Sequence, residues 1–270
     1  MNLQNRRGVI TGAGSGIGRE LAQAFAERGG ALLLVGRRPE PLEETAEMVR
    51  TVGGEAHILA TDVSAGNAAE HVVSSALAQL GELDLLVNNA GNVRAGRLED
   101  TPEDDIRAML ALNLTAPILL TRAALPTLRR RTGSRPLVLT IASGMALTHL
   151  PFYSAYAASK AGVAAFGHSL RRELLDTDVH VATVYPGATA TAMMATSDAG
   201  EELGFGTRTT AEVVADILTA LAADEHEINT SLPSRRELQR LQAIDPLAVD
   251  AKLAPQLARL EAAVRNHSSM

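Results

Sequence analysis

The chain has 270 residues, of which 46 % are hydrophobic, enough to bury the core of one large α/β domain. Its formal net charge of −6 gives no basic surface for a phosphate backbone, so we expect no nucleic-acid partner. The sequence has no cysteine, which excludes disulfides, thiolate catalysis and cysteine metal sites and agrees with a reducing cytoplasm.

The first residues of the chain lead into an apolar strand without the apolar core of a signal peptide. No run of about 18 uncharged apolar residues follows them. We therefore expect a cytoplasmic location and no membrane partner.

Short apolar runs and segments of helical periodicity alternate along most of the chain. The apolar runs are typical of strands buried on both faces, and they cover residues 8–11, 32–35, 57–60, 83–87, 136–141 and 179–184. The helical segments cover residues 17–28, 41–52, 65–80, 101–131 and 155–175. This alternation predicts a doubly wound α/β fold with a parallel Rossmann-type sheet, which binds ligands at the carboxyl ends of its strands.

The pattern changes towards the C-terminus. Residues 189–210 mix small polar with apolar residues, which is typical of a substrate loop over a site. Residues 226–230 form at most one short last strand. We expect one catalytic domain over residues 1–230 and a helical extension over residues 231–270, which packs on that domain or forms a subunit contact. The extension has apolar residues at helical spacing: Leu253, Leu257, Leu260 and Val264.

A glycine-rich turn follows the first strand and opens the first helix. Gly12 allows the tight turn, Gly16 lets the backbone approach a pyrophosphate, and Gly18 permits close helix packing. The helix N-terminus then offers N–H groups to the anion. Gly18 is followed by Arg19 rather than by the lysine of a P-loop, which disfavours nucleotide hydrolysis.

The residues after the second strand distinguish the two nicotinamide dinucleotides. NAD-selective enzymes usually place a carboxylate here, which binds the ribose 2′-hydroxyl and repels a 2′-phosphate. This chain has Gly36-Arg37-Arg38 instead, so Arg37 is available to pair with the 2′-phosphate. We expect NADP(H) as the cofactor. Two solvated arginines at a loop edge are the alternative interpretation.

Tyr156 and Lys160 are the most informative pair in the sequence. Their spacing places them on one face of a helix, and the chain has only three tyrosines and two lysines. Ser143 follows the fifth strand, at the edge where ligands bind, so it can reach the same point. A tyrosine, a lysine and a serine that converge in this way favour proton transfer to a carbonyl oxygen.

Taken together, the motifs resemble those of the short-chain dehydrogenase/reductase family, over about residues 5–225. Thr11-Gly12-x-x-x-Gly16-x-Gly18 is similar to the family's cofactor motif, and Asn88-Asn89-Ala90-Gly91 to its sheet-stabilising motif. The resemblance implies Ser143, Tyr156, Lys160 and Asn113 as the catalytic residues. It also implies adenine contacts from Asp62-Val63 and a carboxamide cradle from Pro186-Gly187-x-x-x-Thr191. The cofactor contacts we expect are Gly12, Ser15, Gly16, Ile17, Gly18, Arg37, Asp62, Val63, Asn89, Ala90, Gly91, Tyr156, Lys160, Pro186, Gly187, Thr189 and Thr191.

The implied chemistry interconverts a carbonyl and a secondary alcohol. Tyr156 would give or take the hydroxyl proton, with its pKa lowered by about three units by Lys160 and the oxidised nicotinamide. Ser143 would donate a hydrogen bond to the substrate oxygen. Lys160 would also bind the ribose hydroxyls. Pro117 lacks an N–H, which loosens the helix at Asn113 and lets a water enter as a proton relay.

The rest of the sequence adds weaker expectations. The seven histidines lack paired metal spacing, so we expect no metal. Tyr153 is predicted to line the pocket rather than to act as the acid. An apolar small-molecule substrate is predicted from residues that are expected to line the site: Met193, Met194, Leu203, Phe205, His149, Leu150 and Phe152.

Two questions stay open in the sequence. A catalytically idle NADP-sensing or scaffold protein of the same fold is the alternative to an enzyme, and the complete set of catalytic residues argues against it. The glycine-rich last strand that completes a tetramer in many family members is missing here. Monomer, dimer and tetramer are therefore all left open.

Overall fold

A single parallel sheet of seven strands forms the centre of the molecule in the computed structural model, which describes residues 1–131, 133 and 135–270. The strands are β1 (Arg7–Thr11), β2 (Ala31–Gly36), β3 (Glu55–Ala60), β4 (Leu85–Asn88), β5 (Leu137–Ile141), β6 (His180–Tyr185) and β7 (Glu227–Asn229). Their spatial order is β3-β2-β1-β4-β5-β6-β7. The predicted doubly wound α/β fold is confirmed, and the short last strand is found as β7.

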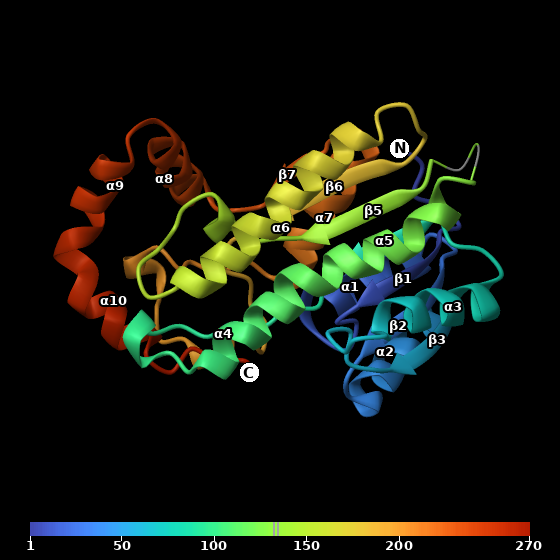
Figure 1. Cartoon of the computed structure of the whole chain (residues 1–270), viewed down its shortest axis with the longest axis horizontal. Coiled ribbons are helices and arrows are strands. Elements are labelled where there is room, and N and C mark those ends of the chain that lie inside the picture. The colour runs from blue at the N-terminus through green and yellow to red at the C-terminus, as the bar shows by residue number, and fades with distance from the viewer. Residues whose placement is uncertain (132, 134) are drawn as a thin grey trace.

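Helices cover both faces of the sheet, as right-handed crossovers require (Figure 1). The helices of the described residues are α1 (Gly16–Ala26), α2 (Pro39–Thr51), α3 (Ala68–Leu80), α4 (Glu103–Leu110), α5 (Ala116–Leu128), α6 (Ser154–Glu173), α7 (Thr210–Ala222), α8 (Pro233–Ile244), α9 (Pro246–Leu253) and α10 (Leu257–Val264). Helices α1, α2 and α7 pack on one face, and α3, α5 and α6 pack on the other.

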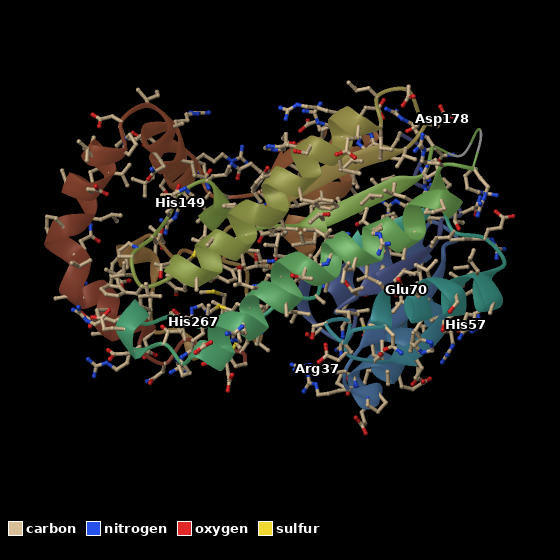
Figure 2. The ribbon with its side chains drawn as sticks, viewed as in Figure 1. Arg37, His57, Glu70, His149, Asp178 and His267 are labelled. Atoms are coloured by element: carbon tan, nitrogen blue, oxygen red, sulfur yellow. The ribbon has the colours of Figure 1, made fainter. Side chains whose placement is uncertain are left out.

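The last three helices lie beyond the carboxyl ends of the strands (Figure 1). The helical tail predicted from sequence is present, but Pro246 begins a new helix and a turn at residues 254–256 separates α9 from α10. Leu260 and Val264 on α10 are buried, whereas Leu257 is exposed. After α10 the chain returns to the sheet domain, where the Ala95 N–H donates to the His267 carbonyl oxygen at 2.9 Å (Figure 2).

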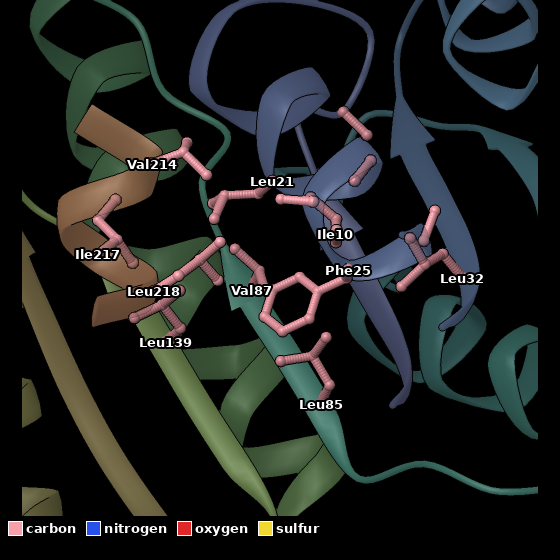
Figure 3. Packing of buried hydrophobic residues seen from close by; sticks show 14 of the residues in the cluster. Ile10, Leu21, Phe25, Leu32, Leu85, Val87, Leu139, Val214, Ile217 and Leu218 are labelled. Atoms are coloured by element: carbon pink, nitrogen blue, oxygen red, sulfur yellow. The ribbon is translucent and has the colours of Figure 1, made fainter. Parts of the chain in front are cut away.

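Alternate residues of the central strands pack into two separate cores. Ile10 points to the face of α1 and α7, and its neighbour Val9 to the opposite face. Figure 3 shows the first core, in which Phe25 of α1 packs on the face of strands β1 and β4. Helix α7 contributes Ile217 to the same core. Burial on both faces explains why the strands appear in the sequence as continuous apolar runs.

The segment predicted as one helix over residues 101–131 consists of α4 and α5 with a π-helical turn, Ala111–Thr115, between them. The Ala116 N–H donates to the carbonyl oxygen of Ala111, five residues earlier. Pro117 follows and has no N–H for the carbonyl of Asn113. The loosened backbone that Pro117 predicts is therefore found, directly at Asn113.

The same stretch, Glu103–Leu128, is long and apolar enough to cross a membrane by length and composition. In the structure its second half, α5, packs on the sheet and buries Leu120, Ala124 and Leu128 in the second core. Core helices of soluble proteins pass the same criterion, so the stretch is weak evidence for a membrane-spanning helix. The expected lack of a membrane partner stays a prediction.

At the amino end of β6, His180 is buried as a neutral imidazole. Its ring stacks on His226 with centroids 4.2 Å apart, Nε2 donates to the Glu225 carbonyl oxygen at 3.1 Å, and Nδ1 lies 3.5 Å from the Arg135 guanidinium. Burial, followed by the charges of His226 and Arg135, lowers the pKa of His180 to about 4.

The chain should therefore lose stability as the pH falls from 7 towards 4. In that window the unfolded state binds a proton at an ordinary histidine pKa, while the folded state does not. The shift corresponds to a loss of at most about 3 kcal/mol in the free energy of unfolding. Urea denaturation at pH 7, 6, 5 and 4.5 measures it, and His180→Gln should flatten the dependence. An equal slope in both proteins would assign the effect to another group.

Candidate active site

The predicted site residues come together at the carboxyl edge of the sheet, around a cavity of about 270 Å³. The switch point of the strand order, between β1 and β4, lies at this edge. Residues that line this main cavity come from the turn before α1, the ends of β4, β5 and β6, and the loop after β6. The predicted residues among them are Gly12, Ser15, Gly16, Ile17, Asn89, Ala90, Gly91, Ser143, Tyr156, Lys160, Pro186, Gly187, Thr189 and Thr191.

The glycine turn has the backbone that the sequence predicts. Gly12 and Gly16 have φ angles of +65° and +54°, which side chains rarely allow. A Cβ on Gly16 would lie 3.0 Å from the Thr191 Cγ2, and one on Gly18 only 2.4 Å from the Gly12 carbonyl oxygen. Among the described residues no side chain caps the first turn of α1. Its N–H groups therefore remain available to an anion, and the turn fits a pyrophosphate.

Thr11 fixes the neighbouring segment against this turn. Its hydroxyl accepts hydrogen bonds from the N–H groups of Asn89 (3.0 Å) and Ala90 (3.1 Å) and donates one to the Val87 carbonyl oxygen (3.2 Å). The Asn89 side chain donates in return to the Thr11 carbonyl oxygen at 2.8 Å. The sequence analysis placed Thr11 in the motif without this role. A threonine at the carboxyl end of a buried strand was the available signal.

A second cavity adjoins the turn, where an adenosine would lie if the glycine turn held its pyrophosphate. Arg37, Asp62 and Val63 line it together with the glycine turn. The side chain of Arg37 is exposed at the rim, next to α2 (Figure 2). A hydrogen bond from the Ser64 side chain, with a smaller effect from the charge of Arg37, lowers the pKa of Asp62.

Ser143, Tyr156 and Lys160 all line the main cavity. Ser143 follows β5, and its Oγ accepts the Met145 N–H at 3.1 Å. Tyr156 and Lys160 lie one turn apart on α6, and both are buried. The Lys160 ammonium donates to the Ile141 carbonyl oxygen, at the end of β5, at 3.0 Å. The fifth strand and the helix after it thus position all three groups.

Burial changes the acidity of the two groups on α6. It raises the pKa of the Tyr156 phenol, and a hydrogen bond with Ser143 acts in the opposite direction. Burial lowers the pKa of Lys160 to about 8. The lowered phenol pKa was predicted for Tyr156 beside both Lys160 and an oxidised nicotinamide, and it stays a prediction for that state.

Asn113 lies behind the cavity rather than in its wall. Its Oδ1 accepts the Asn92 N–H, and its Nδ2 donates to the Asn92 carbonyl oxygen, each at 2.9 Å. Nδ2 also donates to Ser159 Oγ at 3.1 Å, and this hydroxyl donates to the Tyr156 carbonyl oxygen at 2.7 Å. A Cβ on Gly91 would lie 3.0 Å from Asn113 Oδ1 and 3.3 Å from Lys160 Nζ, so both residues flank Gly91.

The substrate side of the main cavity is lined mostly by apolar side chains. Leu150, Met193, Met194 and Phe205 line it as predicted, and so does Tyr153. The prediction for His149 is wrong: its side chain is exposed and its Nδ1 lies 3.2 Å from the Met145 carbonyl oxygen, away from the lining (Figure 2). The turn after Ser143 directs Leu150 inward and its neighbour outward. Leu203 and Phe152 pack behind the lining residues.

Besides Leu232, two polar lining residues from the C-terminal extension were missed by the sequence analysis. The Tyr153 hydroxyl donates a hydrogen bond to His267 Nδ1 (2.6 Å), and His267 Nε2 donates one to the Met193 carbonyl oxygen (3.1 Å). Arg235 stands in the first turn of α8 and also lines the main cavity. Nothing local in the sequence marks either residue, because both reach the site only through the way α8 and α10 dock.

The side chains of the site offer proton transfer next to an anion cradle. A buried phenol, a buried ammonium and a hydroxyl line the same cavity as the uncapped start of α1. Within residues 1–131, 133 and 135–270, no group of three or more His, Asp or Glu residues is arranged to hold a metal ion. This combination suits transfer of a proton to or from a substrate held beside a dinucleotide.

Comparison with known sequences gives a consistent family. Residues 7–202 match the family model for short chain dehydrogenases. An uncharacterized oxidoreductase of Thermotoga maritima is 36 % identical over 189 residues, which are 70 % of this chain and 74 % of that protein. The bovine dehydrogenase/reductase SDR family member 7B is 36 % identical over 241 residues, 84 % of this chain and 73 % of that one. A short chain dehydrogenase of Pseudocercospora fijiensis is 40 % identical, but the 73 % of this chain that aligns spans only 64 % of that relative.

Two solved structures have the same fold. A short chain dehydrogenase/reductase of Burkholderia phymatum, in complex with NAD, superposes with a TM-score of 0.82 at 24 % identity and covers 92 % of this chain and 96 % of its own. An alcohol dehydrogenase of Thermococcus sibiricus, complexed with 5-hydroxy-NADP, gives a TM-score of 0.73 at 26 % identity, with 84 % and 97 % covered. Both forms of the dinucleotide thus occur among these structural neighbours.

Proposed function

This chain belongs to the short-chain dehydrogenase/reductase family, and from that premise we propose that it is an NADP(H)-dependent oxidoreductase that interconverts a carbonyl and a secondary alcohol. One observation carries the proposal: Ser143, Tyr156 and Lys160 line the same cavity as the glycine turn of α1. A proton donor, its supporting cation and the dinucleotide cradle therefore share one enclosed space.

We assign Tyr156 as the acid and base. When bound, NADPH supplies the hydride, and its oxidised form adds a positive charge near the phenol. In reduction, Tyr156 would donate its proton to the oxygen of the carbonyl whose carbon would accept the hydride. The Ser143 hydroxyl donates a hydrogen bond to the same oxygen, where negative charge develops. Lys160 stabilises the phenolate that is left and holds the ribose hydroxyls.

We assign Asn113 a positioning role. Its amide is bonded to Asn92 and Ser159, so its side chain joins the π-helical turn to α6 below Tyr156. Its main-chain carbonyl receives no hydrogen bond from Pro117, which leaves this oxygen available to a water. A water between this carbonyl and the Lys160 ammonium would return the proton from solvent.

The cofactor preference should depend on Arg37. The segment Gly36-Arg37-Arg38 between β2 and α2 contains no carboxylate, and its two arginines line the second cavity. We expect Arg37→Glu to weaken NADPH binding about 100-fold, since it replaces a charge-assisted bond to the 2′-phosphate by repulsion. NADH binding should change by less than about threefold.

Fluorescence titration of the wild-type chain and the variant with NADPH and NADH measures this preference. Arg172→Glu, at an exposed position near the end of α6, makes the same charge change away from the cavities and is the matched control. Equal or tighter binding of NADH by the wild-type chain would reject the NADP assignment and leave the rest of the proposed function standing.

A panel of ketones with NADPH, followed at 340 nm, tests the reaction itself. Oxidation of NADPH that depends on a ketone supports the enzyme. If no member of a wide panel is reduced by chain that binds NADPH, the NADP-sensing or scaffold alternative takes its place.

A further inference from the structure

We infer that the substrate carries a carboxylate in addition to its carbonyl or hydroxyl group, and that Arg235 binds this carboxylate in the wall of the main cavity. The inference rests on the proposed function, because it assigns the substrate class of the same site. It adds an anionic group to the apolar carbonyl or alcohol substrate expected from the sequence.

The guanidinium of Arg235 is held in place by neutral groups only. Its carbon lies 5.3 Å from the centroid of the Phe205 ring, and Nη2 donates to the carbonyl oxygen of Gly204. Among residues 1–131, 133 and 135–270, no carboxylate lies within 4.0 Å of it. The remaining N–H groups are therefore available for a planar anion, and carboxylates match this geometry in a bidentate way.

The position of Arg235 in its helix is electrostatically unfavourable without a ligand. It is the third residue of α8, a helix of 12 residues whose first turn contains no acidic residue. The N-terminus of a helix carries partial positive charge, which disfavours a cation there and favours an anion. Burial also lowers the pKa of Arg235, which shows that its charge is poorly solvated. An anion in the cavity would relieve both effects.

The cavity contains no competing negative charge. Neither Asp nor Glu occurs among its lining residues, which do include the cationic side chains Lys160, Arg208 and Arg235. Arg208 is already paired with Asp216 at 2.6 Å, and Lys160 stands beside Tyr156. Arg235 is thus the lining arginine whose charge is not neutralised by the protein.

The surrounding wall defines the rest of the substrate. Met145, Leu150, Met193 and Met194 are flexible or aliphatic side chains in the same lining. They favour a hydrocarbon segment between the group that reacts at Tyr156 and the group that binds at Arg235. Oxo acids and hydroxy acids with an aliphatic chain have this arrangement.

The test compares matched pairs of substrates. The probes are straight-chain oxo acids with the ketone at carbon 4, 6 or 8, each with its methyl ester, so that only the charge differs. The variants are Arg235→Met, Arg235→Lys and, as control, Arg240→Met, which removes an exposed arginine of the same helix. The readout is the ratio of kcat/KM for the acid to that for its ester.

For at least one chain length we expect the wild type to prefer the acid by about 10-fold or more. Arg235→Met should lower kcat/KM for that acid about 50-fold, mainly through KM, and for the ester less than about threefold. Arg235→Lys should retain part of the preference, and Arg240→Met all of it. Equal losses for acid and ester in Arg235→Met would show a structural role and overturn the inference.

A binding experiment separates this inference from the proposed function. Calorimetry with octanoate and octan-1-ol, on chain loaded with NADP⁺, reports carboxylate recognition without turnover. Binding of octanoate that is lost in Arg235→Met supports the anion site even if no ketone is reduced. Reduction of ketones together with equal binding of octanoate and octan-1-ol would reject the anion site and keep the oxidoreductase.

Discussion

Exchange of Tyr156 to Phe should lower kcat for ketone reduction by about 10³-fold, equivalent to about 4 kcal/mol of barrier. The substitution removes only the hydroxyl that would donate the proton to the carbonyl oxygen. The ring stays in its edge contact with Tyr153, 6.3 Å between centroids, so the cavity should keep its shape. Affinity for NADPH should change by less than about threefold, measured by fluorescence titration beside steady-state kinetics.

Tyr185→Phe is the matched control for this prediction. It removes another buried phenol hydroxyl, one that donates to Glu227 at 2.6 Å, outside the cavity lining. The kcat of Tyr185→Phe should stay within about threefold of the wild-type value. Retained turnover in Tyr156→Phe, together with a large loss in Tyr153→Phe, would move the proton transfer to the neighbouring tyrosine and contradict the assignment.

Exchange of Lys160 to Met should produce the second large effect. Without the ammonium, the phenolate of Tyr156 loses the positive charge that we assign to its stabilisation. The rate of alcohol oxidation, which requires the deprotonated phenol, should then rise only at a pH about 2 units higher than in the wild type. At pH 7 we expect a loss of about 10²-fold in oxidation. Affinity for NADP⁺ should fall as well, because Lys160 is assigned to the ribose.

The chain offers a control for this exchange, since Lys252 is its other lysine and is exposed on α9. Lys252→Met should leave both the pH profile and the affinity unchanged. A wild-type pH profile in Lys160→Met, with the rate lowered equally at every pH, would show that Lys160 acts through the structure alone.

The central fold could be predicted from the sequence because its strands are buried on both faces. The run at residues 32–35 has no polar face and forms the interior of β2, with its neighbours extending the strand by one residue at each end. The helix before the site was predicted as continuous, and Pro117 pointed to the place where it loosens. The helical tail was predicted with less detail: the break at residues 254–256 falls inside an apolar spacing that looks continuous, and the break at Pro246 lies before that spacing.

That Ser143, Tyr156 and Lys160 line one cavity was predictable for a similar local reason. Tyr156 and Lys160 are fixed by one helix turn, and Ser143 by the end of a strand, so short spacings determine their positions. Arg235 and His267 were not predictable, because α8 and the segment after α10 bring them to the cavity from distant parts of the chain. Their contacts with Phe205 and Tyr153 exist only in the docked structure.

The acidity of Tyr156 shows where sequence reasoning reaches its limit. The lowered pKa was predicted for a phenol beside two cations, Lys160 and an oxidised nicotinamide, but the sequence does not show how far burial excludes water from the phenol. The structure shows both groups buried, and desolvation then has the larger effect on Tyr156. A phenol that stays protonated at neutral pH is well prepared to donate a proton in reduction.

Transfer of deuterium tests the central claim most directly. The wild-type chain is incubated with NADPH that carries deuterium at the transferred position, together with the panel of neutral ketones and oxo acids, and the products are analysed by mass spectrometry. The account predicts a secondary alcohol with one deuterium on the carbinol carbon, formed by the wild type and not by Tyr156→Phe. Products without deuterium, or no alcohol at all from chain that binds NADPH, would contradict it.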